Sequence, residues 1–307
     1  MRQRHTLFFI LLVCLIAGAG FFVIQKNHSR PTNSLPASAS ISIETSTPEP
    51  QALPVLPTYH TVTLESTAPI AELTEKVGKE QVPVVLALNR IDTRHIQVGA
   101  VLTVPDSSTD FLTLTPFPTN LPSVNEVPKI IFVSQKIQAF AAYEYGTLVR
   151  WGPVSTGKKS TPTASKLYYT NWKGKLITST IDDGWIMPWY FNLDNQEGIS
   201  MHQYDLPGYP ASHSCVRLAE ADAEWMYTWA EQWILDKKTG KKLANGTPTI
   251  VFGTYAYSET APWKLLPTDQ NATVVTTEDL EETLAPYLSD IQASVENRIK
   301  ILNPDSQ

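Results

Sequence analysis

The chain has 307 residues, of which 42% are hydrophobic and 18% are charged, and its formal net charge is −6. This length allows one sizeable domain with smaller parts, and the apolar content excludes a chain that is mostly disordered. A mildly acidic protein has no general electrostatic attraction to nucleic acid or to an anionic membrane surface, so no nucleic-acid partner is expected.

The first 24 residues are predicted to form a transmembrane signal anchor. Arg2 and Arg4 precede the uncharged run Leu7–Ile24, which at about 1.5 Å per residue is just long enough to span a hydrocarbon core of about 30 Å. Ala17-Gly18-Ala19 also fits a cleavage site, but the apolar run continues to Ile24, which favours a retained anchor. Positive charge before the run predicts that the rest of the chain lies outside the cytoplasm.

A small module is predicted over residues 58–105, between two linkers. Residues 25–57 and 106–127 are rich in Pro, Ser and Thr and lack a helical or strand period, which is typical of linkers. Between them, a short strand near Tyr59, two stretches of near-helical spacing and a closing strand ending at Pro105 predict the order β-α-α-β.

The largest folded part is predicted over residues 128–257 and is mainly β. Short runs rich in β-branched and aromatic residues alternate with polar turns, and one helical stretch over residues 219–235 carries an aromatic stripe that indicates core packing. Residues 258–307 are predicted to be a connector followed by an amphipathic helix over residues 277–302, kinked at Pro286.

The candidate catalytic residues are grouped around Cys215. The other cysteine, Cys14, lies in the apolar N-terminal run, so no disulfide framework is expected. His202, His213 and Arg217 are near Cys215 in sequence, and positive neighbours favour the reactive thiolate form of cysteine. A lone cysteine or histidine is usually an inert structural residue, but this density in one segment favours acyl transfer through an activated nucleophile.

A zinc site is an alternative interpretation of the same residues. His202, His213 and Cys215 could supply three ligands. However, His213 and Cys215 are only two positions apart, and no fourth ligand is evident. We therefore predict no metal and no cofactor.

The segment Lys129–Tyr257 resembles the L,D-transpeptidase family with the YkuD-type catalytic domain. That family's signature is a His, a spacer, then Ser/Thr-His-Gly-Cys-apolar-Asn/Arg, and here His202 is followed by Ser212-His213-Ser214-Cys215-Val216-Arg217. Two further segments match in order: Val154–Thr163, which resembles the family's Ser-Thr-Gly and Thr-Pro-Thr strand and turn, and Met187–Phe191, which resembles its Met-Pro-Tyr segment. The resemblance implies a β-sandwich over residues 128–257 with a helix after the cysteine.

The resemblance also implies a role for each matching residue. Cys215 would be the nucleophile, His202 the base, and His213 a residue that lines the pocket. The expected substrate-binding residues are Ser212, Ser214, Arg217, Thr161, Pro162, Trp189 and Tyr190. Backbone N–H groups of residues 213–215 would hold the oxyanion, and Arg217 would fix the loop or bind a substrate carboxylate.

The sequence departs from the family pattern at three points. The Gly before the cysteine is Ser214, the last Gly of the Thr-Pro-Thr-Gly turn is Ala164, and the spacing from His202 to Cys215 is short at 13 positions. If position 214 needs a positive φ, a serine there is strained by about 1–2 kcal/mol.

Residues 58–105 resemble LysM, a module that binds N-acetylglucosamine polymers. The helix ending in Leu88-Asn89 and the closing segment Val98–Pro105 match that family, whereas Glu65–Ala68 departs from its usual Gly-Asp-Thr-Leu. The resemblance implies glycan strands as partners of this module.

These observations predict a membrane-anchored enzyme of the bacterial cell envelope, with its catalytic domain outside the cytoplasm. The expected reaction is formation of peptidoglycan crosslinks, or attachment of a protein, through a cysteine thioester with stem peptides. Two alternatives stay open: an L,D-carboxypeptidase that uses water as the acceptor, and a cell-wall binding protein without catalysis.

Overall fold

The computed structural model of the protein describes residues 57–107 and 110–304. The predicted anchor over residues 1–24 and nearly all of the first linker lie outside these ranges. Within them, no helix has both the length and the apolar character that a membrane span requires. The described residues cluster as one compact unit.

The module over residues 58–105 has the predicted order of strand, two helices and strand. Its elements are β1 (Tyr59–Thr63), α1 (Pro69–Val77), the 3₁₀ helix η1 (Lys79–Gln81), α2 (Val82–Leu88) and β2 (Val101–Pro105). The two strands pair antiparallel, and Leu73, Val85 and Leu102 are buried together between the helices and the strands. The likeness to LysM remains a prediction.

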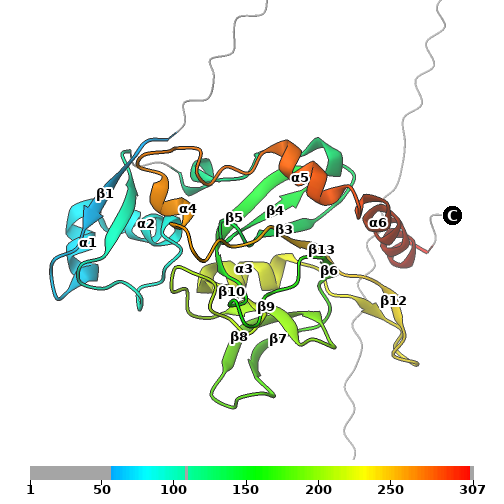
Figure 1. Cartoon of the computed structure of the whole chain (residues 1–307). Helices are drawn as coiled ribbons and strands as arrows, with labels where there is room; N and C mark the ends of the chain where they lie inside the picture. The colour runs from blue at the N-terminus through cyan, green and yellow to red at the C-terminus, as the bar shows by residue number, and fades with distance from the viewer. Residues whose placement is uncertain (1–56, 108–109, 305–307) are drawn as a thin grey trace, which may run out of the picture. The chain divides into compact units, whose positions relative to one another are not determined.

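The strands of the larger part form one continuous sheet rather than the predicted sandwich (Figure 1). The strands are β3 (Ile130–Ser134), β4 (Ala139–Glu144), β5 (Thr147–Ser155), β6 (Leu167–Tyr169), β7 (Lys173–Thr178), β8 (Ile186–Asp194), β9 (Ile199–Gln203), β10 (Val216–Leu218) and β13 (Pro248–Phe252). Their order is β6-β13-β3-β4-β5-β10-β9-β8-β7. The long strand β5 joins the two halves, because it pairs with β4 along most of its length and with β10 at Val154 and Ser155.

Both faces of the central strands are covered. Ile130 and Phe132 belong to one apolar cluster, whereas the alternate residues Ile131 and Val133 belong to another. Successive side chains of a strand point to opposite faces, so a strand buried on both sides is an unbroken apolar run. This explains why Ile130-Ile131-Phe132-Val133 shows no alternation.

The expected linker over residues 106–127 is packed against the sheet where the structure describes it. It contains the 3₁₀ helices η2 (Phe111–Leu114) and η3 (Pro122–Val124), and its buried residues are Leu114, Phe117, Leu121, Val124 and Val127. The Phe111 ring stacks on Trp151 with centroids 4.2 Å apart. Proline content indicated a linker, but the apolar residues between the prolines bury enough surface to fix the segment.

The predicted helix over residues 219–235 is shorter than expected. α3 (Glu220–Trp229) ends six residues earlier, and Trp233 lies beyond it, where its backbone N–H donates to the Asn171 carbonyl at 3.1 Å. Trp225 and Trp229 stack with centroids 4.8 Å apart. The stripe therefore has the expected packing role, except for Trp233.

The C-terminal residues return to the sheet and to the module. α4 (Pro262–Leu265) brings Trp263 into a fully buried position. Pro286 breaks the predicted helix into α5 (Thr277–Leu284) and α6 (Leu288–Leu302), and Leu280, Leu284 and Ile291 enter the same cluster as β3. The sequence left open whether this helix packs on the domain, and the structure places it there.

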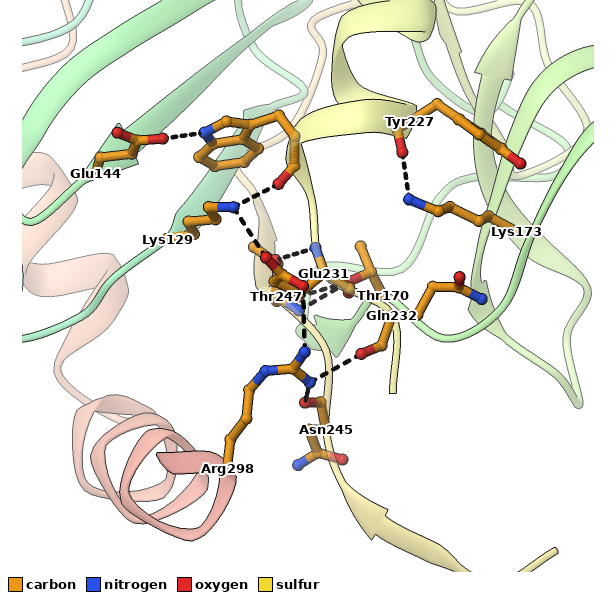
Figure 2. Close-up of polar contacts among 11 residues, drawn as sticks. Lys129, Glu144, Thr170, Lys173, Tyr227, Glu231, Gln232, Asn245, Thr247 and Arg298 are labelled. Carbon is orange, nitrogen blue, oxygen red and sulfur yellow. Dashed lines mark hydrogen bonds and ion pairs between the residues drawn. The ribbon is translucent and has the colours of Figure 1, made fainter. Parts of the chain in front are cut away.

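Arg298 ties α6 to the strand pair β11 (Ile234–Leu235) and β12 (Lys242–Ala244) (Figure 2). Its Nη1 donates to the backbone oxygens of Gln232 and Asn245, both at 2.8 Å. Its Nη2 lies 3.2 Å from the Glu231 carboxylate, which also accepts from Lys129 at 3.0 Å.

Candidate active site

The predicted nucleophile and base come from neighbouring segments of the sheet, because β9 and β10 pair in parallel. Arg217 in β10 is the register partner of His202 in β9, and Cys215 directly precedes β10. Ile199 and Met201 point into the core, so alternation along β9 places Ser200 and His202 on the opposite face. Strand β10 separates Cys215 from α3, so Cys215 does not stand directly ahead of that helix as the sequence suggested.

His202 is a neutral imidazole with a fixed tautomer. Its Nδ1 lies 2.9 Å from the Gln203 carbonyl oxygen, which can only accept, so Nδ1 carries the proton and Nε2 is left as an acceptor. Burial lowers the pKa of His202 to about 4. The hydrogen bond to Gln203 raises this pKa, and the charge of Arg217 lowers it further. At neutral pH this side chain can take a proton at Nε2.

Cys215 has two polar neighbours. Its Sγ is 3.3 Å from the Ser200 hydroxyl oxygen and 3.6 Å from the Gly198 carbonyl oxygen. Among the described residues no hydrogen bond joins Cys215 to His202, but both line one cavity of about 270 Å³. The other lining residues that enter the argument below are Tyr190, Asn192, Ser212, His213 and Arg217.

The turn before Cys215 is held by the neighbouring Thr-Pro-Thr turn. The Thr161 hydroxyl donates to the Ser212 carbonyl at 3.1 Å, and the Thr163 hydroxyl donates to the Ser214 carbonyl at 2.8 Å. The Ser212 hydroxyl donates to the Cys215 carbonyl at 2.5 Å. These bonds fix the backbone that presents the sulfur.

Ser214 has φ +83°. This left-handed conformation explains why a glycine is the usual residue at this position of the family pattern, since glycine adopts it without a steric penalty. The Ser214 hydroxyl donates to the Thr161 carbonyl at 3.3 Å, a long bond that offsets little of the strain.

Gly157 permits the two turns to approach each other. A Cβ at this position would lie 2.2 Å from the Thr161 carbonyl oxygen and 2.5 Å from the Thr163 nitrogen. Both obstacles are backbone atoms that cannot move aside. The Gly157 N–H donates to the Thr163 hydroxyl at 2.9 Å, so the contact also positions that threonine.

Backbone donors are free next to the sulfur. Within the part of the chain that the structure describes, no group accepts a hydrogen bond from the N–H of Ser214 or Cys215. Free N–H groups beside a nucleophile can stabilise an oxyanion that develops during attack on a carbonyl.

Two positive groups flank the cysteine. Lys158 Nζ lies 3.0 Å from His213 Nε2, so His213 accepts there and carries its proton on Nδ1. Loss of hydration and the charges of Lys158 and Arg217 lower the pKa of His213. Arg217 lies over the Tyr204 ring at 4.6 Å and forms no hydrogen bond or ion pair with any described residue, so its guanidinium can receive a carboxylate.

Four of the predicted substrate-binding residues do not line this cavity: Ser214, Thr161, Pro162 and Trp189. Thr161 and Pro162 lie behind the Cys215 turn, and the Ser214 hydroxyl points to the Thr161 carbonyl. Pro162 lines a separate cavity. Trp189 packs on Tyr227 of α3 with ring centroids 5.6 Å apart, on the face of β8 opposite to Tyr190, which lines the cavity.

Ser200, Asn192 and Lys158 are site residues to which the sequence assigned no role. The period of two along β9 gives Ser200 the same face as His202, a signal that was available in the sequence. For Asn192 and Lys158 only the three-dimensional arrangement brings the side chain to the site. No group of three or more potential metal-binding side chains exists among the described residues, so His202, His213 and Cys215 do not form a ligand set.

Residues 128–259 match the family model described as YkuD, the L,D-transpeptidase catalytic domain. This segment is an L,D-transpeptidase catalytic domain. A search of curated proteins found no match to the chain.

Several solved L,D-transpeptidase structures are similar to part of the chain. The protein from Stackebrandtia nassauensis is 23% identical, with 41% of this chain and 56% of that chain covered and a TM-score of 0.33. The protein from Mycobacterium smegmatis is 17% identical, with 41% and 59% covered and a TM-score of 0.33. L,D-transpeptidase 1 from Mycobacterium tuberculosis is 21% identical, with 41% and 62% covered and a TM-score of 0.31. The chain thus spans little more than half the length of these proteins.

Proposed function

We propose that the protein is a peptidoglycan L,D-transpeptidase that crosslinks stem peptides through a thioester on Cys215. The observation that carries this proposal is the tautomer of His202, a buried neutral imidazole whose Nε2 is free to accept a proton in the cavity that also contains Cys215. The match of residues 128–259 to the L,D-transpeptidase catalytic domain supports the same chemistry.

The reaction follows from these groups in two steps. His202 Nε2 takes the thiol proton, and the Cys215 sulfur attacks the carbonyl carbon of the donor peptide bond. The bond to the leaving amine breaks as that amine receives the proton, which leaves a thioester. An acceptor amine, which loses a proton to His202, then attacks the thioester and restores the thiol.

The flanking groups would stabilise charge during both steps. The free N–H groups of Ser214 and Cys215 are donors for the oxyanion. Arg217, which forms no ion pair with any described residue, would bind a carboxylate of the stem peptide, and Tyr190 would form part of the cavity wall.

The proposed location is the bacterial cell envelope. The charge and length of residues 1–24 support an anchor in the cytoplasmic membrane with the enzyme outside it. Residues 58–105 would bind glycan strands, a role supported by their sequence resemblance to LysM.

The test is incubation of the purified full-length chain with tetrapeptide stems, followed by mass spectrometry of the products. Crosslinked dimers are expected from the wild type, and none from Cys215→Ala. Trimmed stems without dimers would identify a carboxypeptidase instead. If neither product forms and a carbapenem leaves no adduct on Cys215, the protein is not an enzyme of this kind.

A further inference from the structure

A row of buried polar side chains leads to the Cys215 sulfur. Ser200 is 0% exposed, Asn192 is 2% exposed and Tyr190 is 6% exposed. They come from the adjacent strands β8 and β9, and Asn192 is the register partner of Ser200. Buried polar groups must find hydrogen-bond partners, so their arrangement is tightly determined.

The hydrogen bonds at the far end of this row have a fixed direction. Asn171 donates through Nδ2 to the Leu193 backbone oxygen at 3.0 Å and to Asn192 Oδ1 at 3.1 Å. The backbone oxygen can only accept, which fixes the orientation of the Asn171 amide. Because Asn192 Oδ1 accepts, its Nδ2 is the donor to the Tyr190 hydroxyl oxygen at 3.1 Å.

The direction at the sulfur follows from its second contact. Cys215 Sγ lies 3.6 Å from the Gly198 carbonyl oxygen, which can only accept, so the thiol donates there. The Ser200 hydroxyl, 3.3 Å from Sγ, is therefore the donor of that pair. A donor aimed at sulfur favours the thiolate over the thiol, since hydrogen bonds to an ionised acceptor are the stronger ones.

We propose that Ser200, in the row of buried polar residues on β8 and β9, is a positioning residue for the nucleophile and donates a hydrogen bond to the Cys215 sulfur. Ser200 thereby holds the side chain of Cys215 and stabilises its ionised form. The inference rests on the proposed role of Cys215 as nucleophile, but it concerns the thiol itself and needs no cell-wall substrate to be tested.

The experiment measures the rate of iodoacetamide alkylation against pH, followed by mass spectrometry of the peptide that contains Cys215. In Ser200→Ala the pH at half-maximal rate is expected to rise by about 0.5–1 unit, because the thiolate loses one donor. Ser200→Thr keeps a hydroxyl at this position and is expected to stay near the wild-type midpoint. Tyr143→Phe, which deletes a hydroxyl bonded to the Pro118 carbonyl elsewhere in the core, is the matched control and leaves the midpoint unchanged.

A midpoint that stays at the wild-type value or falls in Ser200→Ala overturns the proposal, and so does an equal rise in Ser200→Thr. If Ser200→Ala does not fold, Ser200→Val is compared with Ser200→Thr, since the two side chains have nearly the same shape and differ by the hydroxyl. Equal midpoints of that pair reject the proposal. Absence of crosslinking together with the expected midpoint shift in Ser200→Ala would reject the proposed function and leave this inference standing.

Discussion

The backbone conformation of Ser214 predicts that the protein gains stability when the side chain is removed. Ser214→Gly should raise the free energy of unfolding by about 0.5–1 kcal/mol, because relief of about 1–2 kcal/mol of left-handed strain exceeds the added entropy of the unfolded chain. Urea denaturation of both proteins measures this difference.

Ser258→Gly is the matched control, since Ser258 is exposed and does not have a positive φ. That change should lower stability slightly. A tenfold or larger drop in the acylation rate of Ser214→Gly would mean that the Ser214 hydroxyl takes part in the reaction and that strain is not its main effect.

His202 predicts how stability depends on pH. Its pKa is about 4 in the folded protein and about 6.5 when unfolded. Between these values only the unfolded state binds the proton, so stability falls as pH decreases from about 6.5 to about 4, by up to about 3 kcal/mol. Denaturation curves at pH 7 and pH 4.5 should show the loss in wild type and a much smaller loss in His202→Gln.

The exposed His60 provides the comparison for that measurement. His60→Gln should keep the wild-type loss between the two pH values. An equal loss in His202→Gln would show that another group causes it.

At the residue scale, the sequence predicted residues that meet at one cavity but not their surroundings. Cys215, His202 and Arg217 were predicted because a dense local motif carries them, and the pairing of β9 with β10 brings their segments together. Trp189 was misplaced because successive side chains of a strand point to opposite faces, so it cannot share the cavity with Tyr190. Lys158 was missed because its contact with His213 depends on the packing of two turns.

Arg298 supplies the charged hydrogen bonds that hold helix α6 to the segments beside β11 and β12, as Figure 2 shows. Arg298→Ala should lower the free energy of unfolding by about 1–3 kcal/mol, because the backbone oxygens of Gln232 and Asn245 lose charged donors. Lys300→Ala, at an exposed position of the same helix, should change stability by less than about 0.5 kcal/mol. Thermal unfolding followed by circular dichroism compares the two, and equal effects would contradict the fastening role.

Helices and strands could be predicted where the hydrophobic periodicity and the length of the segment were clear. The strands near Ile130 and Thr249 and the helices of the N-terminal module came from simple patterns. The segment over residues 106–127 did not, because prolines between buried residues hide its contribution to the core. The sandwich was wrong since the pairing of β10 with β5, which merges the two halves, involves residues far apart in sequence.

At the scale of the whole molecule, Arg90 joins the N-terminal module to the rest of the chain. It is 1% exposed and lies between the rings of Trp151 and Trp263, at 5.6 and 5.4 Å from their centroids. Its Nε donates to the Ile137 carbonyl at 3.0 Å. Burial lowers the pKa of Arg90 to about 9, so it remains charged at neutral pH and depends on these partners.

Arg90→Ala should therefore lower the free energy of unfolding by about 3 kcal/mol or more, through a cavity and unpaired carbonyls. Tryptophan fluorescence during denaturation measures this loss of stability, because Arg90 contacts Trp151 and Trp263. Arg94→Ala is the control at the same junction: Arg94 pairs with Asp205 but is 59% exposed, so less than about 1 kcal/mol is expected. Similar losses for both would refute a special role for Arg90.

The C-terminal residues pack against the sheet. The end of the family match is therefore not the end of the part of the chain that folds as a unit. The match ends at residue 259, before Trp263, Leu280 and Leu284, which are at most 1% exposed. Leu280 and Leu284 belong to the same apolar cluster as the strands. A fragment cut at the boundaries of the match would present that apolar face to water and aggregate. Failure to obtain soluble protein from such a fragment would reflect the position of the cut and carry no information about its catalytic competence.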